Sequence, residues 1–240
     1  MSVTDRVVQA YFNYAYNPVY DLVATQPGQY HKLQQTCIDM LELKTNDRVL
    51  CVGVGTGNEV HYLLQANENI SIVGIDLSRS ALRRAQNKAA RMGQEIELQR
   101  MDARCLTFPD ESFNKVICIH LMDFMRDNGK ATEEMFRVLK RGGRFVITYP
   151  SYREGMRLGV NLLRDNIHGS IDSGQPLFLA MLKAVVRMPL GIVYLPLLFR
   201  PGKKSYLRSG LETMMMNLGI EDCRIEEDTV YNDFIVSGEK

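Results

Sequence analysis

The sequence predicts an α/β fold built on a doubly wound, mostly parallel sheet. Short apolar runs alternate with segments whose apolar residues recur every three or four positions, and a glycine-rich turn joins the first run to such a segment. Alternation of this kind builds parallel strands with helices on both faces. With 240 residues, 45% of them hydrophobic, the chain is long and apolar enough to bury one core of this type.

The glycine turn is the most informative stretch of the chain. An apolar run that starts at Val49 leads into G-V-G-T-G at residues 53–57, and a helical pattern follows. Gly53 and Gly55 can take backbone angles closed to other residues and let a ligand approach the main chain, whereas Gly57 lets the next helix begin close to the strand. The turn is therefore predicted to bind a ligand that carries a nucleoside.

A second apolar run, residues 70–75, ends at an acidic residue. Asp76 stands nineteen positions after Gly57, where a carboxylate can accept hydrogen bonds from both hydroxyls of a ribose. The dinucleotide pattern G-x-G-x-x-G is not met, because Asn58 occupies the slot of the third glycine counted from Gly53. A nicotinamide dinucleotide is therefore disfavoured.

The remaining elements continue the alternation. Gly142 and Gly143 are predicted to turn a helix into the fifth strand, and Lys115 is expected at the exposed start of the fourth. Further helices are predicted at 29–43, 58–67, 78–92, around 135–139 and at 207–218, and strands at 96–98, 113–121, 144–149, 222–227 and 231–237.

Several of these motifs together resemble the class I S-adenosylmethionine-dependent methyltransferases. They are the G-x-G-x-G turn, the strand end Gly74–Ser78, the pair Asp102-Ala103 and the stretch Leu139–Arg144. The resemblance covers roughly residues 49 to 150. It implies a seven-stranded Rossmann-like methyltransferase fold and S-adenosyl-L-methionine as the cofactor.

The resemblance also implies the cofactor-binding residues. The three glycines would lie along the methionine part, and Asp76 would bind the ribose. Leu77 would contact one adenine face, and Asp102 would bind the adenine amino group. The full predicted set is Cys51, Gly53, Gly55, Thr56, Gly57, Asp76, Leu77, Asp102, Ala103 and His120. The chain departs from the family at Cys51, where Asp or Glu is usual, so the cofactor's ammonium needs another acceptor: a backbone carbonyl of the turn or an N-terminal tyrosine hydroxyl.

Methyl transfer from a sulfonium needs few catalytic side chains, because the donor is already activated. His120 ends the predicted fourth strand, and a neutral imidazole there can accept a proton from the acceptor. Tyr149 ends the fifth strand and is the second catalytic candidate. The alternative is that both are structural residues at strand ends. The other histidines show no metal-ligand spacing, and no metal is predicted.

The predicted domain is single, with two elaborations around the cofactor-binding core at 46–150. Residues 1–45 are expected to form a helical cap whose tyrosines Tyr11, Tyr16 and Tyr20 contact substrate. This Tyr-rich segment resembles the N-terminal region of quinone-biosynthesis C-methyltransferases and bacterial phosphatidylethanolamine N-methyltransferases. The alternative is that these aromatics only pack on the domain.

A helical insertion after the fifth strand, residues 151–205, separates the core from a C-terminal helix and strand pair at 206–240. Its apolar part, residues 176–200, is interrupted by charges, prolines and a glycine, so it should not span a membrane. It is expected either to contact a membrane surface or to cover an apolar substrate.

The composition and charge of the chain limit the classes of partner and the cellular location that we expect. The net charge of +1 gives no field that would gather nucleic acid, and none is predicted as a partner. The five cysteines have no C-x-x-C spacing and are expected to be reduced thiols. No secretory signal is apparent, so the expected location is cytoplasmic, with peripheral contact at the inner membrane surface. The oligomeric state is not readable.

The expected function is methyl transfer from S-adenosylmethionine to an apolar small molecule, either a prenylated quinone or phenol or a membrane lipid. Two alternatives remain open. One is N- or O-methylation in secondary metabolism, and the other is a non-catalytic relative that binds the cofactor without turnover, for which Cys51 is the motivating observation.

Overall fold

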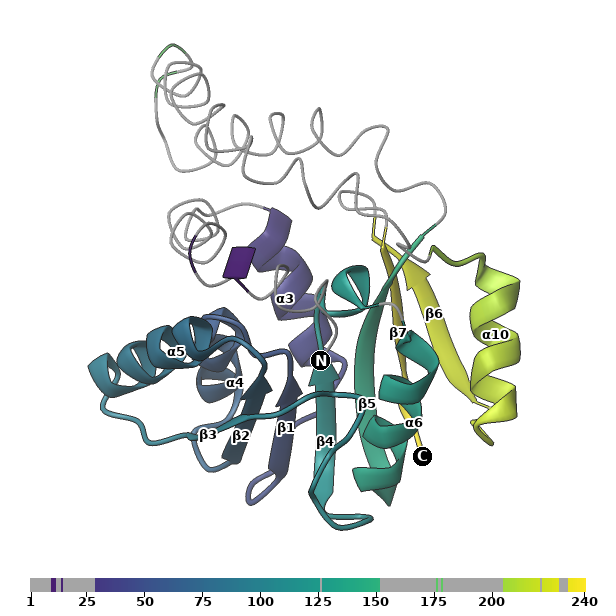
Figure 1. Ribbon diagram of the computed structural model, residues 1–240, viewed down its shortest axis with the longest axis horizontal. Coiled ribbons are helices and arrows are strands. Elements are labelled where there is room, and N and C mark those ends of the chain that lie inside the picture. The colour runs from purple at the N-terminus through teal and green to yellow at the C-terminus, as the bar shows by residue number, and fades with distance from the viewer. Residues whose placement is uncertain are drawn as a thin grey trace.

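The computed structural model describes residues 10–11, 14, 29–125, 127–151, 176, 178, 205–220, 222–228 and 233–240. Within them the chain forms one seven-stranded sheet with helices on both faces, as Figure 1 shows. The α/β fold class with a mostly parallel sheet is confirmed. Most of the predicted cap (1–45) and most of the predicted insertion (151–205), including residues 179–200, lie outside the described residues.

The strand order is β3-β2-β1-β4-β5-β7-β6. The first five strands in this order pair in parallel, and β7 is antiparallel to both β5 and β6. The strands are β1 (Arg48–Val52), β2 (Ser71–Asp76), β3 (Glu97–Arg100), β4 (Phe113–Cys118), β5 (Leu139–Pro150), β6 (Cys223–Glu227) and β7 (Asp233–Glu239). The helices are α3 (Gln29–Asp39), α4 (Asn58–Ala66), α5 (Arg79–Arg91), the short 3-10 helix η2 (Met122–Phe124), α6 (Asn128–Val138) and α10 (Arg208–Asn217).

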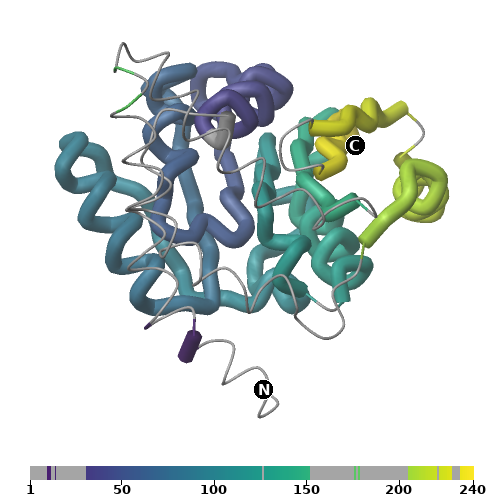
Figure 2. The backbone as a smooth tube through the Cα atoms, turned by 90° about the horizontal axis from the view of Figure 1, so that it is seen from above, coloured from purple at the N-terminus to yellow at the C-terminus, as the bar shows by residue number. Residues whose placement is uncertain are grey.

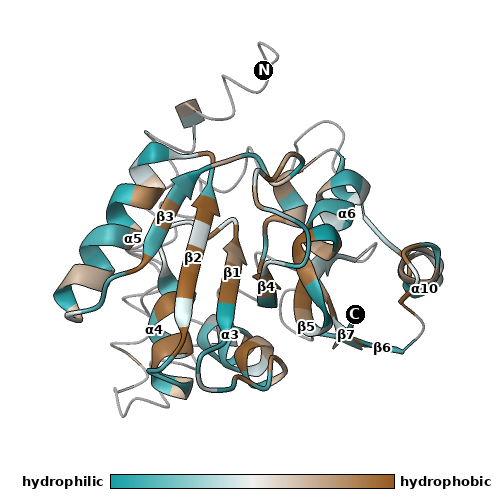
Figure 3. Ribbon diagram, turned by 90° about the horizontal axis from the view of Figure 1, so that it is seen from below, coloured by the Kyte–Doolittle hydropathy of each residue, from teal (hydrophilic) through white to brown (hydrophobic). Residues whose placement is uncertain are grey.

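Side chains of the central strands alternate between two apolar clusters. Val49 and Cys51 of β1 pack in one cluster with residues of α3, α4 and α5. Leu50 and Val52 pack in the other, with residues of α6 and α10. Burying both faces of the sheet provides the main favourable term in folding. Figure 3 shows the resulting pattern, with brown strands inside and hydrophilic outer turns on α5.

The helix termini follow the sequence prediction, whereas the glycine pair before the fifth strand does not. Ser78 Oγ accepts a hydrogen bond from the Ala81 N–H at 3.2 Å and caps α5, and Gly93 beyond its end has φ 68°. By contrast, Gly142 and Gly143 lie inside β5, which begins directly after α6. The prediction that they form a helix-to-strand turn is wrong. The β4–β5 register shifts near this point, so the glycines accommodate an irregularity in the strand.

The topology fixes where a ligand can bind. The connections from β1 lead outward through β2 and β3, while β4 and β5 lie on the other side of β1, so the chain order reverses between β1 and β4. Figure 2 shows the two halves, purple to blue and teal to yellow, side by side. In open α/β sheets, ligands bind at the carboxyl ends of the strands at such a reversal. Because β7 is antiparallel, its amino end lies on this same edge.

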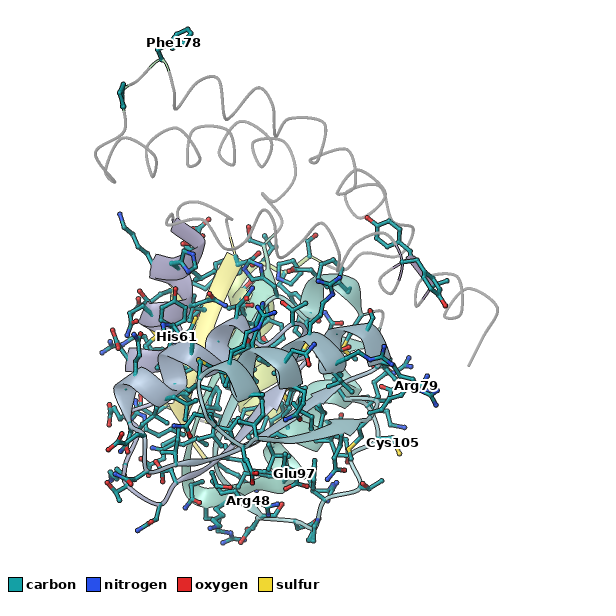
Figure 4. All side chains as sticks on the ribbon, turned by 90° about the vertical axis from the view of Figure 1, so that its left-hand side faces the viewer. Arg48, His61, Arg79, Glu97, Cys105 and Phe178 are labelled. Atoms are coloured by element: carbon teal, nitrogen blue, oxygen red, sulfur yellow. The ribbon has the colours of Figure 1, made fainter. Side chains whose placement is uncertain are left out.

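Charged residues pair at the opposite edge of the sheet, where the parallel strands begin. Arg48 and Glu97 lie next to each other there, with 3.8 Å between Nη2 and Oε2 (Figure 4). Lys115 is buried rather than exposed, because its ammonium donates to the Glu42 carbonyl at 3.0 Å and lies 3.7 Å from the Asp47 carboxylate. The expectation of an exposed Lys115 is wrong.

Candidate functional site

The glycine turn has the geometry that its spacing predicted. Gly53, Gly55 and Gly57 have φ of 72°, 53° and 76°, which side chains strongly disfavour. A Cβ at Gly57 would lie 2.9 Å from the Cβ of Ala85, so this glycine allows α5 to pack against the turn. Among the described residues, a Cβ at Gly55 would meet nothing nearer than the Gly53 oxygen at 3.8 Å. The main chain at Gly55 is therefore open to a ligand.

Asp76, at the end of β2, holds this turn. Its Oδ2 accepts the Gly55 N–H at 3.0 Å, and its Oδ1 accepts the Ser78 N–H at 2.7 Å. Burial raises the pKa of Asp76, and these backbone N–H groups oppose the rise by stabilising the carboxylate. A carboxylate oxygen can accept more than one hydrogen bond. Asp76 thus combines support of the turn with remaining capacity to accept ribose hydroxyls.

Two of the predicted adenine contacts, Leu77 and Asp102, follow the neighbouring strands β2 and β3. Leu77 is 40% exposed, which is unusual for leucine directly after a buried strand. Asp102 follows β3 and is bound by Arg104, whose Nη2 lies 2.7 Å from Oδ2; this hydrogen bond lowers the pKa of Asp102. Oδ1 also accepts the backbone N–H of Arg104 and its Nε–H, both at 3.0 Å. Oδ2 also accepts from Arg104 Nε at 3.3 Å, so both carboxylate oxygens are engaged by Arg104. Ala103 is buried.

Lys88 was missed by sequence reasoning. From α5 it donates to Thr56 Oγ1 at 3.1 Å and to Asn58 Oδ1 at 2.6 Å, so it ties the end of the glycine turn to the neighbouring helix. Thr56, predicted to bind the cofactor, is 2% exposed, and its hydroxyl accepts the first of these two hydrogen bonds. No sequence motif indicates Lys88, because it lies on an ordinary amphipathic helix, about thirty positions from the residues that it contacts.

Cys51 is buried on the α3–α4 face of β1. It is 1% exposed, and burial raises the pKa of its thiol well above the usual value. The side chain therefore stays neutral and cannot supply the charge of the acidic residue that the family usually has there.

His120 follows β4 by two residues and turns toward the start of β7. Its backbone has φ 57°, and its N–H donates to Thr148 Oγ1 at 2.7 Å. Its Nε2 lies 3.2 Å from Oδ2 of Asp233, whose side chain is only 3% exposed. A carboxylate in this position orients an imidazole and stabilises its protonated form. Sequence reasoning missed Asp233, although an antiparallel last strand would bring its first residue to this edge.

Asp123 of η2 completes a small polar cluster with this pair. One possible ligand atom from each of His120, Asp123 and Asp233 lies within 4.8 Å of the others. Among the residues that the structure describes, this is the group with a spacing that could hold a metal ion. The same spacing also suits a histidine that is hydrogen-bonded to carboxylates, and the sequence predicted no metal.

The side chain of Tyr149 does not reach this edge. It is fully buried in the α6 and α10 cluster, and its hydroxyl lies 2.8 Å from Thr132 Oγ1 on α6. Burial raises the pKa of Tyr149 far above its ordinary value. The structure therefore removes Tyr149 from the candidate site, since its hydroxyl points into the core. Of the predicted substrate contacts, Tyr11 is partly exposed, whereas Tyr16 and Tyr20 lie outside the described residues.

Tyr149→Phe tests this correction. Thr132 Oγ1 donates to the Asn128 carbonyl at 2.8 Å, so Tyr149 is the donor in its bond to Thr132. Removing that one donor should lower the free energy of unfolding by about 0.5–1.5 kcal/mol and leave cofactor affinity unchanged. Chemical denaturation and calorimetric titration with S-adenosylhomocysteine measure the two quantities. A loss of affinity without a loss of stability would return Tyr149 to the site.

Comparisons with known proteins agree with this geometry. Residues 49–143 match a family described as a methyltransferase domain. The chain is 41% identical over 102 residues to a phosphatidylethanolamine N-methyltransferase from Cereibacter sphaeroides, covering 42% of this chain and 49% of that protein. It is 31% identical over 132 residues to a demethylmenaquinone methyltransferase from Thermus thermophilus, covering 54% and 60% respectively. The chain thus spans about half to three fifths of these relatives.

A solved structure shows the same fold over nearly the whole length. Magnesium protoporphyrin IX methyltransferase from Synechocystis, with bound SAH, superposes with a TM-score of 0.65 at 16% identity and covers 98% of this chain and 99% of its own. At that identity the likeness concerns the fold. The matched segment, the two relatives and the glycine turn confirm the resemblance to S-adenosylmethionine-dependent methyltransferases over residues 49–143.

Proposed function

We propose that this chain binds S-adenosylmethionine across the carboxyl edge of β1, β2 and β4 and transfers its methyl group to an apolar small molecule. The observation that carries the proposal is the Asp76 carboxylate bonded to the Gly55 N–H at 3.0 Å, which places a ribose acceptor beside an open glycine turn. The exposed Leu77 supplies an apolar surface next to it. The residues present therefore fit the nucleoside part of the cofactor.

The cofactor supplies a methyl group on a sulfonium, which needs no further activation. When bound, it would supply this methyl group to a nucleophilic atom of the acceptor, and its sulfur would keep the electron pair of the carbon–sulfur bond. The chain's own residues orient the reactants and take the acceptor's proton. His120 is suited to the second task, because its Nε2 lies 3.2 Å from Oδ2 of Asp233, a carboxylate that would stabilise the imidazolium formed when the ring takes a proton.

The acceptor is proposed to be a membrane lipid with an amine headgroup or a prenylated quinol. The similarity to a phosphatidylethanolamine N-methyltransferase and to a demethylmenaquinone methyltransferase supports this class. The apolar sequence at 176–200 also favours it and is proposed to contact the membrane surface. Within the described part of the chain, no helix has the length and apolar character required to cross a bilayer.

A methyl-transfer assay tests the function and separates the acceptors. The purified chain is incubated with S-adenosylmethionine labelled on the methyl group and, in parallel, with phosphatidylethanolamine vesicles, a prenylated quinol in detergent, and phosphoethanolamine. Label is expected in one of the two apolar acceptors. Label in phosphoethanolamine alone would overturn the apolar acceptor. Calorimetric binding of S-adenosylhomocysteine without transfer to any acceptor would favour the non-catalytic alternative.

A further inference from the structure

The carboxyl edge of the sheet has a carboxylate that the family pattern does not account for. Cys51 occupies the position from which β1 usually presents an acid, and its buried thiol stays neutral. Its side chain packs on the face of the sheet that α3 and α4 cover. A replacement acid would therefore have to come from that layer and lie near the end of β1.

Glu59 meets both conditions. It stands in the first turn of α4, directly after the glycine turn, and is partly exposed. The glycine turn leads from the carboxyl end of β1 into α4, so this first turn of the helix lies at the carboxyl edge of the sheet. The carboxylate also interacts electrostatically with Cys51, one residue before the end of β1, with Cys118 at the end of β4 and with Asp76 at the end of β2. The strands β2, β1 and β4 are neighbours in the sheet, so these interactions agree with a position of Glu59 at their carboxyl edge.

The surroundings of Glu59 leave its negative charge without a close cationic partner in the described part of the chain. Lys88 interacts with it electrostatically, but the Lys88 ammonium is bonded to Thr56 and Asn58. The carboxylate accepts a hydrogen bond from its own backbone N–H. Burial raises the pKa of Glu59 to about 8 despite these contacts. A cation brought next to it would stabilise its charged form.

We propose that the Glu59 carboxylate binds the ammonium group of the cofactor's methionine part, in place of the acid that Cys51 cannot provide. The proposal rests on the proposed function, since it assigns one more residue to the same cofactor. It also replaces the earlier expectation that a backbone carbonyl or an N-terminal tyrosine provides this contact. The recognition is a charge-assisted hydrogen bond in a partly desolvated place, where such pairs are strongest.

Two nucleosides make the test specific. S-adenosylhomocysteine carries the amino-acid ammonium, whereas 5′-methylthioadenosine has the same adenosine and a thioether but no amino acid. Calorimetric titration of the full chain with each ligand gives two affinities per variant. Glu59→Gln is expected to weaken S-adenosylhomocysteine at least tenfold and to change 5′-methylthioadenosine less than twofold. The second affinity also shows that the variant is folded around the nucleoside.

The control and the rescue isolate the carboxylate. Glu68→Gln removes the same charge from an exposed residue just beyond the other end of α4 and should change neither affinity. In the double variant Cys51→Asp, Glu59→Gln, the restored strand acid should recover most of the lost affinity for S-adenosylhomocysteine. The proposal is overturned if Glu59→Gln leaves both affinities unchanged or lowers them equally, or if the double variant gains nothing while its 5′-methylthioadenosine affinity is intact. If neither nucleoside binds the unmodified chain, the proposed function itself fails.

Discussion

Asp76→Asn is expected to weaken binding of S-adenosylhomocysteine roughly 100- to 10,000-fold. Two ribose hydroxyls donated to an ionised acceptor contribute about 1.5–3 kcal/mol each, and every 1.4 kcal/mol is about a factor of ten. The substitution also disturbs the turn. One of the two carboxylate oxygens, which now accept N–H groups of Gly55 and Ser78, becomes an NH₂ group that faces a donor.

Calorimetric titration measures this loss, and thermal denaturation shows how much of it reflects unfolding. The matched control is Asp222→Asn, which makes the same change at an exposed residue just before β6 and should leave affinity unaltered. An Asp76→Asn protein that keeps its affinity would exclude the ribose site. If the variant melts at a lower temperature, and its loss of affinity disappears when binding is measured well below that temperature, then Asp76 only supports the turn.

The glycine turn was predictable because each of its glycines is required by a different backbone constraint. Gly57 must be small where Ala85 packs against it, and Gly55 must leave the main chain open. Such constraints fix spacing, so they can be read from a sequence. A glycine pair without fixed spacing is ambiguous: Gly142 and Gly143 read equally well as a helix-ending turn or as an irregularity within β5, and the structure shows the second.

The misassignment of Tyr149 could have been avoided from the alternation of the strand. Side chains of β5 point to opposite faces in turn, so Tyr149 shares a face with Phe145 and Ile147. All three belong to the cluster under α6 and α10. Being last in a strand places the backbone of a residue at the ligand edge, but the parity of its position decides where the side chain goes.

Contacts between residues far apart in sequence were beyond sequence reasoning. Lys88 reaches Thr56 from another helix, and Asp233 reaches His120 from the last strand. Their residue types are ordinary at such positions, and only the packing of α5 on the turn and the antiparallel direction of β7 bring them to the site. Glu59 is intermediate, since it adjoins the glycine motif but shows its proximity to Cys51 only once α4 is placed.

His120→Ala is expected to lower the rate of methyl transfer about 100- to 10,000-fold, the range for loss of a positioned general base. The affinity for S-adenosylhomocysteine should stay within about twofold if His120 acts on the acceptor. Asp233→Asn should lower the rate as well, because the amide no longer stabilises the protonated imidazole that forms when His120 takes a proton. The rates are measured with labelled S-adenosylmethionine and saturating phosphatidylethanolamine vesicles or prenylated quinol.

His61→Ala is the matched control, because it removes an exposed imidazole of α4 and should leave the rate unchanged (Figure 4). Chelation separates the two readings of the polar cluster that His120 and Asp233 form with Asp123. If the pair is a base and its orienting acid, treatment with EDTA leaves the rate intact. A rate that falls with EDTA and returns on adding a divalent cation would make the cluster a metal site instead. If the rate in His120→Ala stays within threefold of the unmodified chain, the acceptor loses its proton to solvent and this histidine only shapes the edge.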